Sequence, residues 1–267
     1  MTDDFTTVTT PRPAGAMRFT TTVPDSWQQG RGAFGGLVIA NLVRALEAAE
    51  RTEGRSLRSL TAELCGPVLP GPADIAIEAL RLGSGVSTLA ARLTQGGEVL
   101  AHAVGVLGRA RADRPLRSFL APPSPPPWRD VPLLPIHEGT SAATFARFFE
   151  FRNVGPLPFS GGADPVTSGW IRPRNPGPAR DSAYIAALAD AYWPALFSIE
   201  PSPRPVGTIS FTLELAGTCD GLDPDAPLFH RSRAVAERDG YLVEFRELWG
   251  EDGRLLALNQ QTIVVIR

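Results

Sequence analysis

Polar side chains recur at every third position of residues 35–52, and aliphatic residues fill the positions between them. The polar members of this stretch are Asn41, Arg44, Glu47 and Glu50. In an α-helix of 3.6 residues per turn they form one narrow polar stripe, so the remaining surface must be buried. The pattern predicts an almost fully buried helix, which begins at two glycines, Gly35 and Gly36.

A second predicted helix, over residues 181–197, is more apolar. From Ala183 to Phe197 its one ionisable group other than tyrosine is Asp190. Burial of a carboxylate without partners costs several kcal/mol as an order of magnitude, so we expect Asp190 to have hydrogen-bonding company. The alternative is that Asp190 caps a turn before Pro194 or faces solvent.

Segments of alternating polar and apolar residues follow each helix, which is typical of half-buried strands. They lie near 59–71, 73–83, 86–95 and 98–109 in the first part, and near 209–218, 227–238, 240–250 and 254–266 in the second. Shorter strands are expected near 17–23, 146–154 and 167–172. Gly-Gly at 96–97 and Asp-Gly at 239–240 and 252–253 predict hairpin turns.

The same order of elements therefore occurs twice. "AEL" at 62–64 aligns with "LEL" at 213–215, and "GGEVLA" at 96–101 aligns with "DGRLLA" at 252–257. An Arg- and Pro-rich stretch separates the copies. We predict an α+β fold of two tandem units, each an antiparallel sheet wrapped around a central helix, with residues 1–110 and 144–267 as the units and 111–143 as the linker.

Composition and charge limit the function. The chain has 267 residues, 43% of them hydrophobic, and a net charge of −2, which predicts no binding to nucleic acid or to a membrane. The first twenty residues lack a signal-peptide pattern, and no apolar run of about 20 residues is present, so a cytoplasmic location is expected. Cys65 and Cys219 have no CxxC spacing, so we predict no metal site and two buried, reduced thiols.

Other catalytic motifs are missing from the sequence, which contains no GxSxG, no P-loop, no HExxH and no GxGxxG placed after a strand. His102, His137 and His230 have no acidic residue at a spacing typical of a dehydratase or hydratase. We therefore expect His102 and His230 to be ordinary strand residues and His137 to lie in the linker.

Several stretches, in order, are similar to the type II acyl-CoA thioesterases, which hold two hotdog folds in one chain. They are "FGGLVIANLVRA", "GPVLPG", "IEALRLGSGVSTLAARLTQGGEVLAHAVGVLG", "SGWIRPR", "ALADAYWP", "VGTISFTLEL" and "EDGRLLALNQQTIVVIR". The resemblance implies tandem hotdog folds and hydrolysis of an acyl-CoA to free acid and coenzyme A without a cofactor. This chain has "LTAELCGPVLPG" where the family often carries a His before the turn.

The resemblance also implies that Asp190, Thr208 and Gln261 orient an attacking water, which would lie between Asp190 and Gln261. In the overlay of the two copies, the first copy has Ile39, Leu57 and Gly105 at these positions, so one site per chain is expected.

Two of these assignments have alternatives. Strict alternation turns Thr208 outward with Ser210 and Thr212, unless a bulge or a partner subunit changes its face. Gln260 competes with Gln261, and the family spacing from Ala257 favours Gln261.

Substrate-binding residues are expected at the start of the first helix and beside the second. Gly35 and Gly36 leave the backbone open to a ligand, and N–H groups there would stabilise a developing oxyanion; close packing is the alternative role. Trp193, with Trp170 and Tyr192, lines an acyl pocket or packs in the core. The arginines at the linker contact coenzyme A phosphates or are solvated; they are Arg109, Arg111, Arg114 and Arg117.

Unpaired edges of hotdog sheets predict a homodimer. Two functional alternatives stay open at this point: a non-catalytic protein that binds acyl thioesters or apolar ligands, and an enzyme for acyl carrier protein thioesters.

Overall fold

The computed structural model describes residues 4–111, 116–136 and 143–266. Its helices are α1 (Phe5–Val8), α2 (Gly35–Ala49) and α3 (Ser182–Ala191), with 3-10 turns η1 (Asp25–Trp27), η2 (Trp128–Asp130), η3 (Thr144–Phe148) and η4 (Ala195–Ser198). The strands are β1 (Arg12–Gly15), β2 (Arg18–Val23), β3 (Gln28–Gln29), β4 (Gly32–Ala33), β5 (Ser56–Leu64), β6 (Gly71–Leu82), β7 (Val86–Gln95), β8 (Glu98–Gly108), β9 (Phe149–Asn153), β10 (Val166–Pro173), β11 (Val206–Leu215), β12 (Leu228–Arg238), β13 (Tyr241–Trp249) and β14 (Leu255–Val265).

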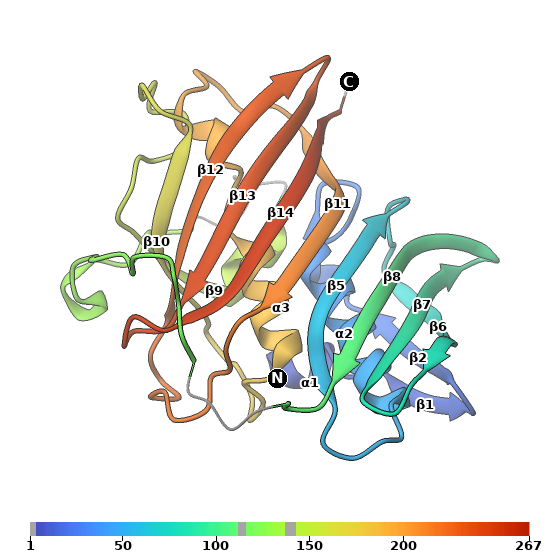
Figure 1. Cartoon of the computed structure of the whole chain (residues 1–267). Helices are drawn as coiled ribbons and strands as arrows, with labels where there is room; N and C mark the ends of the chain where they lie inside the picture. The colour runs from blue at the N-terminus through green and yellow to red at the C-terminus, as the bar shows by residue number, and fades with distance from the viewer. Residues whose placement is uncertain (1–3, 112–115, 137–142, 267) are drawn as a thin grey trace.

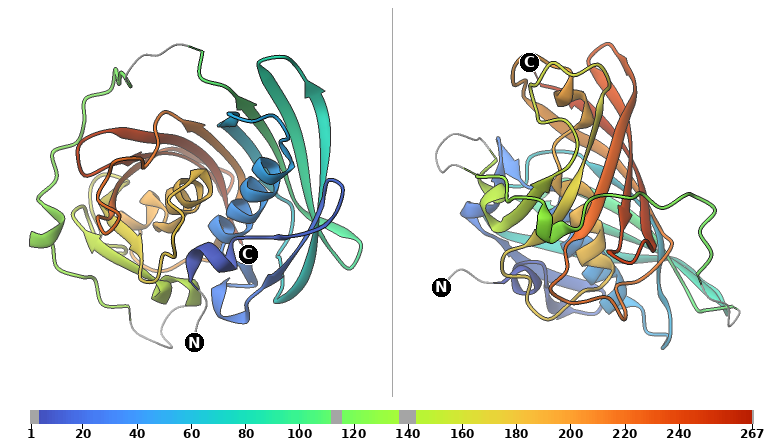
Figure 2. Two further views of the ribbon diagram at one scale, coloured as in Figure 1. Left: turned by 90° about the horizontal axis from the view of Figure 1, so that it is seen from below. Right: turned by 90° about the vertical axis from the view of Figure 1, so that its left-hand side faces the viewer.

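Twelve strands form one continuous sheet in the order β1-β2-β6-β7-β8-β5-β11-β14-β13-β12-β10-β9, and β3 pairs with β4 separately. The two predicted units meet where β5 pairs antiparallel with β11. Figure 1 shows this single sheet, and Figure 2 shows it curling around α2 on one side and α3 on the other. The arrangement confirms the α+β fold of two tandem hotdog units, each with a central helix.

The predicted helix over 181–197 is too long. α3 ends at Ala191, and a 3-10 turn follows from Ala195. Pro194 explains the break, because proline has no N–H to continue the helical ladder and disfavours helical geometry in the residue before it. The first helix likewise ends at Ala49 rather than at residue 52.

α2 and α3 run antiparallel to each other in the interior. The start of α2 lies close to the second half of α3. A Cβ added at Gly36 would be only 2.8 Å from the carbonyl oxygen of Ala187. At the opposite end, Arg44 of α2 forms an ion pair with Asp181, the N-cap of α3, at 3.2 Å. One hydrophobic cluster extends over both helices and the inner faces of both halves of the sheet.

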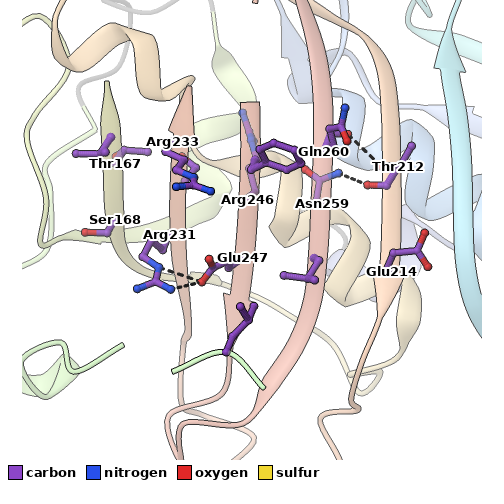
Figure 3. A pocket seen from close by; sticks show the side chains of 15 residues that line it. Thr167, Ser168, Thr212, Glu214, Arg231, Arg233, Arg246, Glu247, Asn259 and Gln260 are labelled. Carbon is purple, nitrogen blue, oxygen red and sulfur yellow. Dashed lines mark hydrogen bonds and ion pairs between the residues drawn. The ribbon is translucent and has the colours of Figure 1, made fainter. Parts of the chain in front are cut away.

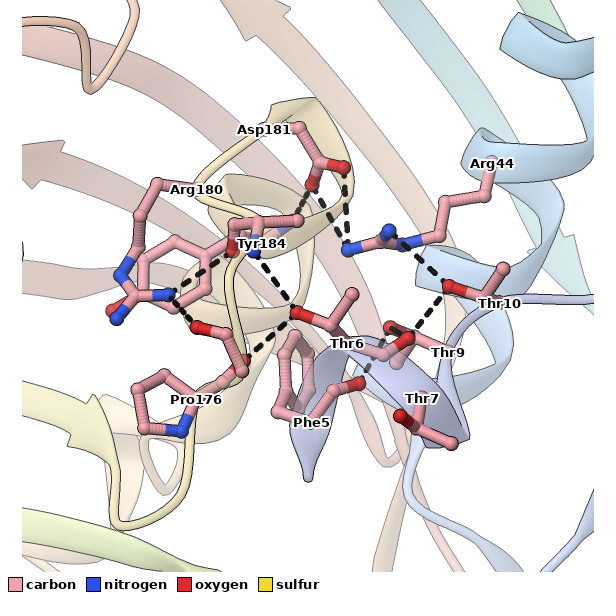
Figure 4. Close-up of polar contacts among 12 residues, drawn as sticks. Phe5, Thr6, Thr7, Thr9, Thr10, Arg44, Pro176, Arg180, Asp181 and Tyr184 are labelled. Atoms are coloured by element: carbon pink, nitrogen blue, oxygen red, sulfur yellow. Dashed lines mark hydrogen bonds and ion pairs between the residues drawn. The ribbon is translucent and has the colours of Figure 1, made fainter. Parts of the chain in front are cut away.

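The N-terminal segment joins the two halves, as Figure 4 shows. The Phe5 N–H donates to the carbonyl oxygen of Asn175 at 2.8 Å, and the Thr6 hydroxyl donates to that of Pro176 at 2.9 Å. Thr10 accepts a hydrogen bond from Arg44 at 3.3 Å. The segment thus holds the beginning of α3 beside α2, which supports the helix pair from the end opposite Asp190.

The described part of the Arg- and Pro-rich stretch packs on the second half of the molecule. The Trp170 Nε1–H donates to the carbonyl oxygen of Pro126 at 3.0 Å, and Val131 is buried beside Trp170 and Phe229. The cysteine prediction is wrong for Cys65, which is exposed because it follows the end of β5; Cys219 is half-buried. In the described residues, no helix is long and apolar enough to cross a membrane. No group of three or more His, Cys, Asp or Glu there is placed to hold a metal ion.

Candidate active site

The three residues singled out in the second half form one chain of hydrogen bonds. Asp190, in the last turn of α3, is 9% exposed, and Gln261 of β14 is fully buried. The Gln261 Nε2–H donates to Asp190 Oδ1 at 2.9 Å, and the Thr208 hydroxyl donates to Gln261 Oε1 at 2.9 Å. The alternative in which Asp190 faces solvent is therefore wrong, since α3 and the sheet enclose it.

Thr208 faces inward because β11 carries a bulge. The pairing with β14 shifts between Thr208 and Ser210, so Ile209 is an extra residue and the faces exchange there. Strict alternation, which predicts an outward Thr208, fails at this point. β5 has the same shift between Leu57 and Ser59, so the bulge is a feature of both halves.

Gln261, and not Gln260, belongs to the site. The two amides lie on opposite faces of β14, and Gln260 is exposed on the outer face. There it lines a groove of about 860 Å³ with Thr212, Arg233 and Phe245, shown in Figure 3. This groove lies on the side of the sheet away from Asp190, so it is separate from the candidate site.

Asn259 is a further neighbour of the Gln261 amide. The sequence did not predict it as part of the site. The Gln261 Nε2–H also donates to Asn259 Oδ1 at 3.0 Å, and the Asn259 amide donates to the carbonyl oxygen of Thr212 at 2.6 Å. Both Nε2 hydrogens of Gln261 are thus used, and Thr208 holds its oxygen. The expected water between Asp190 and Gln261 has no room in this direct hydrogen bond, so Asp190 Oδ2 is the oxygen left to hold one.

Gly35 and Gly36 lie directly against Asp190. A Cβ at Gly35 would lie 2.7 Å from Asp190 Oδ2, and one at Gly36 would lie 2.3 Å from Phe34 Cζ. The Gly36 N–H donates toward the Asp190 carboxylate. Gly36 therefore serves close packing of α2 on α3, whereas Gly35 keeps the space beside Oδ2 free of a side chain.

Opposing effects act on the pKa of Asp190. Burial raises this pKa above the usual range for aspartate, because the charged form loses its hydration. The positive charge of Arg246 and the hydrogen bonds from Gln261 and Gly36 act in the opposite direction. A carboxylate in this setting is a stronger base than an exposed one.

A buried ion pair on β13 also escaped the sequence analysis. Arg246 Nε donates to Glu244 Oε1 at 2.8 Å, and Arg246 reaches backbone carbonyl oxygens at the end of α3. The sequence "YLVEFRELW" contains the pattern that could have revealed this pair, because every second residue of a strand lies on the same face. Leu242, Glu244, Arg246 and Leu248 therefore share one face. Charged residues at two positions of a strand face that is otherwise buried indicate a paired or functional role.

The aromatic candidates divide between two environments. Trp193 is half-buried after α3 and packs on Tyr192 and Phe151, with ring centroids 4.8 and 5.9 Å apart. Trp170 belongs to a separate buried cluster with Phe229 and Trp249. The core-packing alternative therefore holds for Trp170, whose ring packs in a cluster separate from the one around α3.

The remaining basic candidates have partners other than Asp190. His102 Nδ1 is 3.0 Å from Glu63 Oε2 on the neighbouring strand, and His230 is buried with its ring 4.7 Å from that of Tyr192. Arg109 donates to the Glu53 carbonyl oxygen, and Arg117 lies over the Phe119 ring. His137 and Arg114 lie outside the described residues.

The first half has an apolar counterpart of the site. Leu57 and Gly105 hold the positions of Thr208 and Gln261, as the paired registers of β5 with β8 and β11 with β14 indicate. A Cβ at Gly105 would lie 3.0 Å from Leu46 and 3.1 Å from Leu57, so Leu46 covers this pair as Asp190 covers Gln261. The overlay on Ile39 is wrong, because the connection from α3 to β11 is longer than that from α2 to β5.

Comparisons with known proteins match the whole arrangement. A family model described as the acyl-CoA thioesterase N-terminal domain matches residues 23–108, and one described as the acyl-CoA thioesterase C-terminal domain matches residues 122–265. No curated protein sequence gives a match.

Solved structures share the fold over nearly the full chain. A hot dog fold protein of unknown function from Alicyclobacillus acidocaldarius has a TM-score of 0.87 at 25% identity, covering 100% of this chain and 99% of its own. A candidate thioesterase II from Thermobifida fusca has a TM-score of 0.85 at 22% identity, with 98% and 97% covered. An acyl-CoA thioesterase II from Mycobacterium marinum has a TM-score of 0.76 at 17% identity, with 98% of each chain covered.

Proposed function

The chain belongs to the acyl-CoA thioesterase family and is a thioester hydrolase, and we propose that its Asp190 carboxylate activates the water that attacks an acyl-CoA. The observation that carries this proposal is the buried chain of hydrogen bonds from Thr208 through Gln261 to Asp190 Oδ1. These hydrogen bonds fix the carboxylate and leave its Oδ2 atom, beside Gly35, to bind the water.

The reaction proceeds without an acyl-enzyme. The water gives a proton to Asp190 Oδ2 while its oxygen bonds to the thioester carbonyl carbon. The backbone N–H of Gly35, at the start of α2, stabilises the negative charge that develops on the carbonyl oxygen. The C–S bond then breaks, and the sulfur of coenzyme A takes up the proton from Asp190, which regenerates the carboxylate.

Burial tunes Asp190 for this task. A general base works best when its pKa is near the working pH, and the raised pKa of Asp190 moves it in that direction. Arg246 counteracts the rise and favours the ionised form that accepts the proton. The same physics predicts an acid limb in the pH–rate profile above the usual range for an aspartate.

Four further features of the proposal are more specific than the family assignment. Trp193, beside Phe151, lines the wall against which the acyl chain packs. The units 1–110 and 144–267 joined by 111–143, the homodimer and the cytoplasmic location stay predictions of the sequence. The exposed strand β1 supports the dimer, because it is an edge strand of the twelve-stranded sheet and edge strands readily pair with another chain.

A panel of acyl-CoAs of rising chain length tests the function. We expect release of free thiol from at least one member, at a rate proportional to enzyme concentration, and a slower rate with the same acyl group on acyl carrier protein. If acyl-CoAs raise the melting temperature but release no thiol above the no-enzyme blank, the chain is a binding protein and the proposal is wrong. Faster turnover of the carrier-bound thioester would reassign the substrate.

A further inference from the structure

The end of α3 exposes carbonyl oxygens that the helix itself cannot satisfy. Pro194 lies four residues after Asp190 and has no N–H, so it cannot donate the helical hydrogen bond to the Asp190 carbonyl oxygen. Arg246 of β13 supplies the missing donor. Its Nη1 donates to the carbonyl oxygens of Ala189, Asp190 and Tyr192 at 3.1, 3.2 and 3.3 Å.

Glu244 holds this guanidinium in place. Arg246 is 2% exposed and Glu244 is 0% exposed. Glu244 Oε1 accepts from Arg246 Nε at 2.8 Å, and Glu244 Oε2 accepts from the Ala195 N–H at 2.7 Å. The pair therefore grips both sides of the turn at residues 192–194, one side through Arg246 and the other through Glu244.

Fold stability gives only a weak reason for such a pair. Buried ion pairs lose much of their attraction to desolvation, and well-packed apolar residues of similar volume are often as stable or more stable. This pair contacts the backbone of the residue that carries the proposed base. A guanidinium offers rigidly arranged donors, which suits it to fixing several carbonyl oxygens at once.

We propose that Arg246, held by Glu244, is a positioning residue for the thioesterase reaction: it fixes the backbone of Asp190 so that the carboxylate meets Gln261. Its positive charge also acts against the rise that burial causes in the pKa of Asp190. This inference rests on the proposed function of Asp190. Arg246 touches the peptide backbone of the base and acts through it.

The other groups around this helix end do not supply the same charge. His230 on β12 is buried, and burial together with the charge of Arg246 holds its pKa well below the usual value. Burial raises the pKa of Tyr192, so its phenol stays protonated. β14 contributes the amides of Asn259 and Gln261, and α2 contributes Gly35 and Gly36. Arg44, Glu47 and Asp181 lie at the opposite end of α3.

Three variants and one control test the proposal through kcat and the acid limb of the pH profile of kcat/KM. Arg246→Lys keeps the charge beside Asp190, but its single nitrogen cannot replace both Nε, which bonds Glu244, and Nη1, which meets the carbonyl oxygens. We therefore expect kcat to fall about tenfold with the acid limb near that of the parent. Arg246→Met removes the charge as well and moves the acid limb upward by on the order of one pH unit. Glu244→Gln combined with Arg246→Met leaves no unpaired buried charge, and we expect the same upward movement in a folded protein.

The control is Arg231→Met, which breaks the Arg231–Glu247 ion pair on the outer face of the same strands. It should leave kcat and the acid limb unchanged. If the double variant is folded and keeps the parent's kcat and acid limb while Asp190→Asn is inactive, Arg246 has a structural role only and the proposal is wrong. Parent-like kcat in Arg246→Lys would also contradict it. Activity in Asp190→Asn would instead remove the proposed function.

Discussion

The two halves of the molecule use the same scaffold for different purposes. In both halves, the strand that follows the central helix carries a bulge, in β5 of the first half and β11 of the second. The bulge turns one residue inward, toward the last strand of that half, β8 or β14. The first half fills this place with Leu57, Gly105 and the covering Leu46. The second half has Thr208, Gln261 and Asp190, joined by hydrogen bonds. The first half thus accommodates an apolar filling at this place, which supports the proposal that the polar filling of the second half serves catalysis.

The largest expected effect comes from forcing the first half to resemble the second. Leu46→Asp would place a carboxylate against Leu57 and Gly105 without the amide and hydroxyl that accompany Asp190. We expect the free energy of unfolding to fall by about 3–5 kcal/mol in denaturant titrations at pH 7. Leu46→Met, of similar volume, should cost less than about 1.5 kcal/mol. Equal stability of the two variants would show that the first half tolerates a buried charge.

The second half should be most sensitive at the amide between hydroxyl and carboxylate. Gln261→Ala removes the donor to Asp190 and leaves Asn259 and Thr208 without their partner. We expect kcat to fall on the order of 10²-fold, as for loss of a key donor in other active sites. Gln260→Ala, one residue away on the outer face, is the control and should stay within about twofold of the parent. Similar losses in both variants would contradict the assignment of faces.

Replacement of the base should change stability in a pH-dependent way. The pKa of Asp190 is raised in the folded chain, so the folded state binds this proton more tightly than the unfolded state does. Stability from this group is therefore present at low pH and is lost as pH rises through the raised pKa. Asp190→Asn does not titrate, so its stability relative to the parent should grow over that range, by about 1.4 kcal/mol for each pKa unit of the shift. Denaturant titrations at pH 4 and pH 8 measure this difference, and a constant difference would contradict the raised pKa.

The smallest effect is expected at the hydroxyl. Thr208→Val keeps the shape but loses the hydrogen bond to Gln261 Oε1, so the amide is less firmly oriented. One such hydrogen bond contributes about 1 kcal/mol, so we expect kcat to fall about five- to tenfold. Thr212→Val, on the outer face of the same strand, should have no effect on kcat. A larger loss in Thr212→Val than in Thr208→Val would place the bulge elsewhere.

Much of the fold follows from the sequence, because it depends on periodicity and duplication. The alternating segments predict the strands, and the Gly-Gly and Asp-Gly pairs predict the hairpins. The two strongly apolar segments with helical periodicity predict both central helices. The end of α3 could not be placed from periodicity alone, since its apolar pattern continues past Pro194. The inward turn of Thr208 depends on a bulge, which no local pattern around Ile209 reveals.

The candidate site was predictable in part. Asp190 stands out as a lone carboxylate in an apolar helix, and Gln261 follows from the family spacing. The Glu244–Arg246 pair could have been predicted from β13, because both charged residues lie on a strand face that is otherwise apolar. The counterpart Leu46 could not be found by aligning the halves, because the connections after the two helices differ in length.

Hydrolysis of an acyl-CoA by Asp190→Asn at pH 7 tests the central claim most directly. The substitution keeps the size of the side chain and an oxygen to accept from Gln261, but it removes the base. We predict a fall in kcat of about 10²- to 10⁴-fold, with an unfolding transition at least as stable as that of the parent. Parent-like turnover by the folded variant would contradict the account.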